Sequence, residues 1–228
     1  MGYVFTPPQQ VSLPVRGSAD LFPVHRVYCV GRNYAAHAVE MGHDPDKEPP
    51  FFFQKNPDNI ILPGEDFPYP GATNDVHHEI ELTVALESGG ENIPIGEALD
   101  HVFGYGVALD MTRRDLQGAM KKAGRPWEVG KAFEHSAPHS ELVRAADIGH
   151  PDAGAVWLKI NGEMRQEGDI NQLIWKVPEV ISILSGLFTL AAGDIIMTGT
   201  PAGVGPVERG DRLHGHVDGV GELTVSVV

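Results

Sequence analysis

The chain has 228 residues, 42% of them hydrophobic, and its 17 Lys and Arg face 31 Asp and Glu, a formal net charge of −14. This apolar content is enough for a buried core, whereas the acidic balance argues against nucleic acid or an anionic membrane as a partner. No run approaches the roughly 18 apolar residues of a membrane span, and no basic stretch followed by an apolar one opens the chain, so a cytoplasmic protein is predicted. The single cysteine, Cys29, lies in an apolar run and is expected to be packed rather than reactive.

Proline and glycine recur through residues 1–20, a pattern that predicts an extended N-terminal arm. No linker or internal repeat divides residues 21–228, so we expect a single domain there. Alternating or apolar runs predict strands at residues 24–30, 51–55, 59–62, 79–86, 102–111, 130–133, 156–160, 194–198 and 222–227. Helical spacing predicts helices at residues 35–41, 95–101, 112–123 and 177–188.

Two local signals define boundaries within this pattern. Asn161-Gly162 follows an alternating run and is the strongest hairpin signal in the chain, because both residues tolerate positive φ. Pro178 stands at an early position of the last predicted helix, where its missing N–H costs nothing. Many short strands with few helices favour one β-rich α+β domain.

Glu79 and Glu81 stand two residues apart on a predicted strand and therefore share one face. Two neighbouring carboxylates repel each other unless water, a basic partner or a bound cation compensates their charge. One interpretation is the solvated outer face of an antiparallel strand. The other is a divalent metal site.

Asp110, at the end of the next long predicted strand, offers a third carboxylate. Three carboxylates with open positions suit Mg²⁺ or Mn²⁺ rather than zinc, because hard oxygen ligands select hard cations. Alternatively, Asp110 caps the helix predicted to begin two residues later.

His37 and Glu40 are neighbours on one face of the helix predicted at residues 35–41. A carboxylate beside an imidazole orients it and raises its basicity, so the histidine can take a proton from water. The charged, proline-containing loop that follows, residues 43–50, suits an exposed lid. The alternative is a surface pair with no catalytic role.

Basic residues and a glycine-rich loop complete the candidate groups. Lys55, Arg114 and Lys131 each follow a predicted strand, and each could bind an anionic substrate or remain a solvated or ion-paired side chain. Residues 197–205 form a glycine-rich loop whose N–H groups and hydroxyls could bind an anion. The loop lacks the lysine of a nucleotide-binding P-loop, so nucleotide binding is not expected.

Taken together, these residues resemble the fumarylacetoacetate hydrolase superfamily over about residues 24–228. The ordered segments that carry the resemblance are residues 31–34 with His37 and Glu40, 78–82, 109–112 with Arg114 and Gln117, 130–133, 161–163 with Arg165 and Gln166, and 198–205. Within the superfamily the chain looks most like the short bacterial fumarylpyruvate hydrolases of gentisate breakdown. One departure is visible, because Asn56 separates Lys55 from Pro57 where relatives usually have Lys-Pro.

The resemblance implies a mixed β-sandwich roll with a few short helices, a homodimer, and one Mg²⁺ or Mn²⁺ per chain. It also implies a role for each candidate residue: metal ligands Glu79, Glu81 and Asp110; catalytic residues His37, Glu40 and Lys131; and substrate-binding residues Arg32, Tyr34, Arg114, Gln117 and Thr200. Arg32 or Arg114 would pair with the distal carboxylate of a dianionic acylpyruvate.

The implied reaction is hydrolysis of the carbon–carbon bond of fumarylpyruvate to fumarate and pyruvate. Acylpyruvase or oxaloacetate decarboxylase activity is the nearest alternative, and an isomerase of unsaturated diacids is another. A non-catalytic metal-binding or acid-binding module is disfavoured, because such a module would not need His37, Glu40 and Lys131 beside the cation site.

Overall fold

The computed structural model describes residues 2–35 and 49–228. Its six-stranded sheet contains β3 (Arg26–Gly31), β4 (Phe51–Lys55), β7 (Ile80–Leu86), β8 (Val102–Leu109), β11 (Val143–Arg144) and β14 (Asp194–Met197). The strands lie in the order β11-β8-β7-β14-β3-β4. β14 is parallel to β3, and every other neighbouring pair is antiparallel.

A four-stranded antiparallel sheet contains β12 (Ala155–Ile160), β13 (Glu163–Asp169), β16 (Arg212–Val217) and β17 (Gly221–Ser226), in the order β13-β12-β16-β17. β12 and β13 form the hairpin predicted from the sequence. Its turn residues Asn161 and Gly162 have φ of 54° and 87°, the left-handed conformations that such a turn requires.

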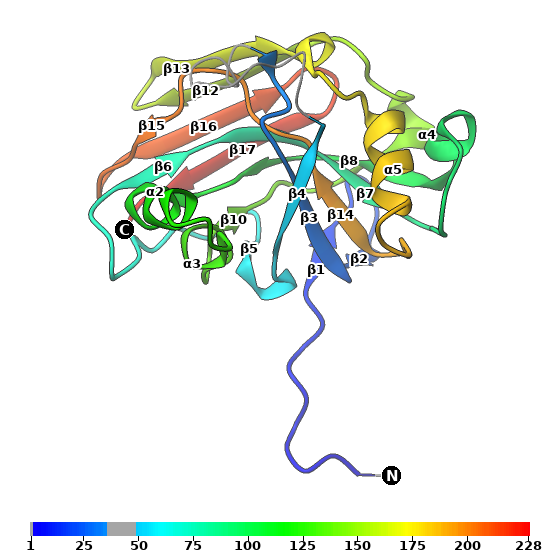
Figure 1. The fold of residues 1–228 in the computed structure, drawn as a ribbon, viewed down its shortest axis with the longest axis horizontal. Coiled ribbons are helices and arrows are strands. Elements are labelled where there is room, and N and C mark those ends of the chain that lie inside the picture. The colour runs from blue at the N-terminus through cyan, green and yellow to red at the C-terminus, as the bar shows by residue number, and fades with distance from the viewer. Residues whose placement is uncertain (1, 36–48) are drawn as a thin grey trace.

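Smaller sheets complete the strand pairing. A three-stranded sheet contains β6 (Val76–His78), β9 (Thr112–Arg113) and β15 (Gly205–Pro206). Two strand pairs are formed by β1 (Ser12–Pro14) with β2 (Leu21–Pro23) and by β5 (Ile60–Ile61) with β10 (Ala137–Pro138). Residues 2–9 project from the body as an extended chain (Figure 1).

The described helices are short: α2 (Arg114–Lys122), α3 (Glu128–Lys131), α4 (Ala145–Ile148) and α5 (Val177–Ser185), with 3₁₀ turns η1 (Pro57–Asn59), η2 (Ile95–His101) and η3 (Ile170–Gln172). α2 and α3 pack together on one side of the molecule, and α5 lies on the other (Figure 1). None of the helices in the described ranges has the length and apolar character needed to cross a membrane.

Two sequence-based element assignments need correction. The helix predicted from residue 112 begins at Arg114, because residues 112–113 pair with β6 as strand β9. The extended segment predicted at residues 130–133 is wrong, because Lys131 ends helix α3. A helix of four residues is too short to impose a detectable periodicity.

The main hydrophobic core lies where the six-stranded and four-stranded sheets face each other. Ile80 from β7, Leu158 from β12 and Leu213 from β16 are each fully buried in it. A smaller cluster contains Cys29, whose Sγ lies 3.8 Å from Sδ of Met197. The predicted β-rich α+β sandwich and the packed cysteine are therefore confirmed.

Candidate metal centre and active site

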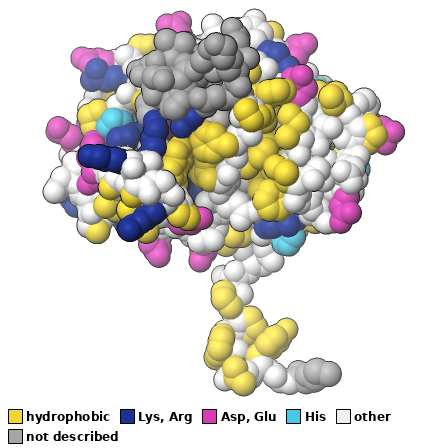
Figure 2. All heavy atoms as spheres, viewed as in Figure 1, with side chains coloured by type: hydrophobic (Ala, Val, Ile, Leu, Met, Phe, Trp, Pro, Cys, Tyr) yellow, Lys and Arg dark blue, Asp and Glu magenta, His cyan; other side chains and the backbone are white. Residues whose placement is uncertain are grey.

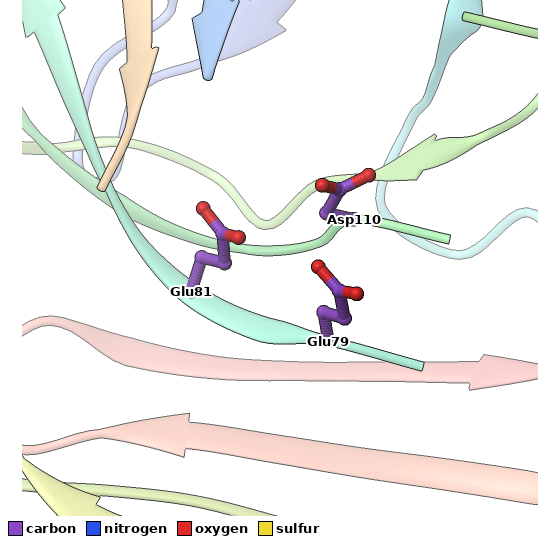
Figure 3. A group of neighbouring side chains, drawn as sticks. All are labelled: Glu79, Glu81 and Asp110. Carbon is purple, nitrogen blue, oxygen red and sulfur yellow. The ribbon is translucent and has the colours of Figure 1, made fainter. Parts of the chain in front are cut away.

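The three candidate metal ligands meet at one end of the β7–β8 hairpin. Glu81 lies in β7 opposite Ala108 of β8, and Asp110 follows β8 and donates its backbone N–H to the carbonyl of Glu79 at 2.8 Å. One oxygen from each carboxylate lies within 4.8 Å of the others. Figure 3 shows the three side chains pointing toward a common region.

Burial decides between the alternatives for these carboxylates. Glu79, Glu81 and Asp110 are 5%, 2% and 0% exposed, so a solvated strand face is excluded. Helix α2 begins four residues after Asp110, and no side chain caps its N-terminus. The capping interpretation of Asp110 is therefore wrong as well.

Basic side chains from elsewhere in the chain surround the triad. Nζ of Lys131 donates to Oε2 of Glu79 at 2.8 Å and to Oδ2 of Asp110 at 2.5 Å. Nη2 of Arg114 donates to Oε1 of Glu79 at 2.5 Å. Burial by itself would lower the pKa of Lys131, but the charges of Asp110 and Glu79 outweigh burial and raise it above its ordinary value.

Lys55 is the third basic residue at the triad, and its side chain is buried. Its Nζ donates to the carbonyl oxygens of Met111 and Lys131. The same Nζ forms an ion pair with Oδ1 of Asp110 at 2.8 Å, and no other group in the described residues makes a hydrogen bond to this buried oxygen. Lys55 therefore holds the segments that carry Asp110 and Lys131.

The environment of Glu81 favours a further cation. Burial raises the pKa of its carboxyl well above the ordinary value, and the charges of Asp110 and Glu79 raise it further. Its Oε2 accepts one hydrogen bond, from the backbone N–H of Gly199 at 2.8 Å. Three buried carboxylates that supply hard oxygen donors fit Mg²⁺ or Mn²⁺.

A pocket opens over the triad and brings together most of the residues predicted from the sequence. The predicted residues that line it are Arg32, Glu79, Glu81, Asp110, Arg114, Gln117, Lys131 and Thr200. Lysines and arginines lie over α2 and α3, next to an apolar area (Figure 2). The pocket is therefore basic and partly apolar outside the triad.

The sequence analysis missed several lining residues, among them Phe51, Phe53, Lys121 and Trp127. The ring centroids of Phe51 and Trp127 lie 5.0 Å apart, edge to face, and those of Phe53 and Trp127 lie 6.0 Å apart. The Arg32 guanidinium lies 5.0 Å from the Phe51 ring centroid. Only the aromatic run at residues 51–53 offered a signal, and it predicted a buried strand rather than a pocket wall.

The remaining predicted residues differ in position. Arg114 contacts Glu79, and its Nη1 donates to Oε1 of Gln117 at 2.7 Å, so it lies beside the triad at the edge of the pocket. Tyr34 is 2% exposed and is not among the pocket-lining residues, and burial raises the pKa of its hydroxyl. His37 and Glu40 lie outside the described residues.

This fold and this buried triad define the class of a β-rich domain with an oxygen-ligand site that could bind a divalent cation. Residues 26–228 match the family described as Fumarylacetoacetate (FAA) hydrolase C-terminal, and the chain belongs to that family.

Individual relatives differ in the activity for which they are named. A crystal structure of fumarylpyruvate hydrolase from Pseudomonas aeruginosa, in complex with Mn²⁺ and pyruvate, is 54% identical, with 100% of this chain and 99% of that chain covered and a TM-score of 0.98. A solved structure from Burkholderia cenocepacia is 49% identical over 100% and 98% of the two chains, with a TM-score of 0.93. Mouse mitochondrial oxaloacetate tautomerase FAHD1 is 43% identical over 88% of this chain and 90% of its own length.

Proposed function

We propose that this enzyme hydrolyses the carbon–carbon bond of an acylpyruvate, with fumarylpyruvate as substrate and fumarate and pyruvate as products, in the breakdown of gentisate. One observation carries the proposal: a single pocket contains the carboxylate triad, the glycine-rich loop and a basic, aromatic wall. The 54% identical fumarylpyruvate hydrolase, crystallised with Mn²⁺ and pyruvate, supports it.

The lining of the pocket offers groups for both carboxylates of a dianionic substrate. Gly199 and Thr200, beside the triad, offer the pyruvyl carboxylate a polar surface. Arg32 and Lys121, which also line the pocket, supply positive charge for a second carboxylate. The flat fumaryl chain can pack against Phe51 and the other aromatic rings of the lining.

Glu79, Glu81 and Asp110 would hold the cation. When bound, the cation supplies Lewis-acid stabilisation of the negative charge that develops on the pyruvyl group, a contribution of several kcal/mol in enzymes that use it. Lys131, Lys55 and Arg114 keep the three carboxylates in place, because each lies within 2.8 Å of a carboxylate oxygen of Glu79 or Asp110.

We assign the proton movements to the chain's own residues. His37, which the family resemblance pairs with Glu40, takes a proton from water, whose oxygen bonds to the acyl carbonyl carbon. Lys131 has three N–H donors and uses two of them on Glu79 and Asp110, so the third can stabilise the oxyanion that forms. When the carbon–carbon bond breaks, its electron pair passes to the pyruvyl group, which takes the proton that His37 accepted from water and leaves as pyruvate. The acyl group keeps the oxygen of water and leaves as fumarate.

Oxaloacetate tautomerisation is a second candidate, favoured by the 43% identity to the mouse tautomerase. That reaction moves a proton between carbon and oxygen and needs neither an attacking water nor bond cleavage. A shorter diacid would also leave much of the Phe51 and Trp127 wall without contact. Pyruvate release from oxaloacetate would instead indicate decarboxylation.

The deciding experiment compares three substrates with Mg²⁺ or Mn²⁺ present. We expect rapid loss of the ultraviolet absorbance of fumarylpyruvate, with fumarate and pyruvate formed in equal amounts, and slower turnover of acetylpyruvate, which lacks the distal carboxylate. Equilibration of enol and keto oxaloacetate without fumarylpyruvate cleavage would refute the hydrolase and support the tautomerase.

A variant of the basic wall tests the distal carboxylate directly. Lys121→Met should raise KM for fumarylpyruvate on the order of 10-fold or more, because it removes a charged hydrogen-bond donor, and should leave KM for acetylpyruvate nearly unchanged. Lys159→Met, on β12, is the matched control. Equal effects of Lys121→Met on both substrates would contradict a role in binding the second carboxylate.

A further inference from the structure

Gln166 is a buried polar residue that the proposed reaction has not yet used. It lies on β13, where its neighbours Arg165 and Glu167 are exposed, and is itself 1% exposed. The β12–β13 register shifts between Leu158 and Lys159, so that Met164 pairs with Lys159 and Gln166 pairs with the inward-facing Leu158. This bulge turns the Gln166 side chain toward the pocket loop.

The Gln166 side-chain amide makes four hydrogen bonds. Its Oε1 accepts from the backbone N–H of Ile80 at 3.0 Å and from Nδ1 of His78 at 2.9 Å. Its Nε2 donates to Oγ1 of Thr200 at 2.8 Å and to the carbonyl oxygen of Pro201 at 2.9 Å. Because the N–H of Ile80 can only donate and the carbonyl of Pro201 can only accept, these two groups determine which way the amide faces.

This orientation determines what the Thr200 hydroxyl can do. Its oxygen accepts a hydrogen from Gln166, so its own hydrogen must point elsewhere. Within the described ranges, no hydrogen bond donated by this hydroxyl is formed. Thr200 is 2% exposed and lines the pocket beside Glu81 and Gly199, so its hydrogen can be donated to a group that enters the pocket.

We propose that Gln166 is a positioning residue that makes the Thr200 hydroxyl an obligatory hydrogen-bond donor to the substrate's pyruvyl carboxylate. The inference rests on the proposed function for the identity of that carboxylate. Gln166 also joins the loop at Thr200 to Ile80, the residue between two triad carboxylates. Gln166 therefore helps to hold the loop against the strand that carries the cation site, together with the N–H of Gly199, which donates to Glu81.

A double-mutant cycle tests this role, with pyruvate binding in the presence of saturating Mn²⁺ as the measurement, made by calorimetry. In Gln166→Glu the carboxylate can only accept, so the Thr200 hydroxyl turns to donate to it and is lost to the ligand. We expect pyruvate to bind on the order of 10-fold more weakly in Gln166→Glu and in Thr200→Val. The double variant should bind pyruvate no more weakly than Thr200→Val alone.

Three comparisons separate positioning from general structural support. Thr200→Ser keeps the hydroxyl and should restore pyruvate binding to within a few-fold of the parent protein. Glu167→Gln, an exposed neighbour on β13, should change nothing. Mn²⁺ affinity should stay near the parent value in Gln166→Glu, and KM for fumarylpyruvate should rise more than kcat falls.

Additive losses in the double variant, or parent-like pyruvate binding in Gln166→Glu, would overturn the inference. If Gln166→Glu does not fold, Thr200→Val still tests the inference. Pyruvate binding by Thr200→Val that equals binding by the parent protein would overturn the inference too. The inference would also be overturned if the parent protein bound Mn²⁺ but not pyruvate. Pyruvate binding without fumarylpyruvate turnover would overturn the proposed function alone.

Discussion

At the scale of single residues, the buried carboxylates and the buried basic side chains of the pocket stabilise each other. Three carboxylates are buried together, and the side chains of Lys55 and Lys131 are 0% and 3% exposed beside them. A buried carboxylate or ammonium is stable only when it is paired, because each loses its hydration. Substituting one member therefore alters the environment of the others.

Asp110→Asn tests the cation site. The amide keeps the shape of the side chain but removes one negative charge, so Mn²⁺ affinity should fall on the order of 10- to 100-fold. Titration of Mn²⁺ followed by electron paramagnetic resonance would measure this change. Glu222→Gln, an exposed carboxylate on β17, is the control, and unchanged Mn²⁺ affinity in Asp110→Asn would contradict the assignment.

From the buried His139 we predict that acid lowers the stability of the folded protein. Burial lowers the pKa of His139 from 6.5 to about 4, and its Nε2 and Nδ1 contact the Thr83 hydroxyl and the Ser140 carbonyl. Between about pH 6.5 and pH 4, His139 binds a proton in the unfolded chain but remains neutral in the folded chain. The free energy of unfolding therefore falls as the pH drops from 6.5 toward 4. The loss from this group is at most about 3 kcal/mol.

Urea denaturation at several pH values between 7 and 4.5 measures that slope. His139→Gln, which has no proton to bind in this range, should lose less stability on acidification than the parent protein. His214→Gln, at an exposed site, should keep the parent slope. An unchanged slope in His139→Gln would show that other groups dominate acid unfolding.

At the scale of elements, the loop between β14 and β15 depends on the strand beneath it. Gly203 has φ of 93°, and a Cβ there would lie 2.3 Å from the carbonyl oxygen of Arg165 on β13. Gly199 has φ of 100° and donates its N–H to Glu81. These glycines let the loop lie directly against β13 and the triad, where Thr200 is presented to the pocket.

Gly203→Ala should disturb the loop in two ways, because the positive φ is strained for alanine and the added Cβ would overlap the carbonyl oxygen of Arg165. Gly162→Ala is the matched control, because its φ is also positive, at 87°, but open space surrounds the added Cβ. We expect Gly162→Ala to cost about 1 to 2 kcal/mol of stability with unchanged pyruvate affinity. Gly203→Ala should cost more and weaken pyruvate binding, and equal behaviour of the two variants would contradict this account of the loop.

At the scale of the whole molecule, the projecting N-terminal segment exposes large apolar side chains that the described residues of a single chain leave uncovered. Tyr3, Val4 and Phe5 are 83%, 97% and 73% exposed, and apolar atoms run along the segment in Figure 2. Exposed apolar groups of this kind commonly mark an interaction surface. A second copy of the chain would cover them in the homodimer that the family resemblance implies.

Light scattering should therefore give a mass near twice 24.6 kDa in solution. Deletion of residues 2–9 should weaken dimerisation, because it removes three large apolar side chains, and the effect should appear as dissociation on dilution. Substitution of Gln9 by Ala should have little effect. A parent protein that is monomeric at micromolar concentration would contradict the homodimer prediction.

Much of the fold and part of the site could be predicted from local patterns. The β12–β13 hairpin follows from Asn161-Gly162, because turn geometry depends on adjacent residues. The alternation after Glu79 indicated a strand correctly, but it could not show that both faces of β7 are buried, since that depends on the sheet packed against it.

The sequence by itself determined the β-rich architecture, the residue types of the carboxylate triad and their hard-cation chemistry, because strand spacing and ligand softness are local properties. Only the tertiary structure decided that Arg114 supports Glu79, that Phe51 and Trp127 form a pocket wall, and that Gln166 turns inward to Thr200. These contacts join residues far apart in the chain through a β-bulge, a four-residue helix and close glycine packing, none of which leaves a periodic signal in the sequence.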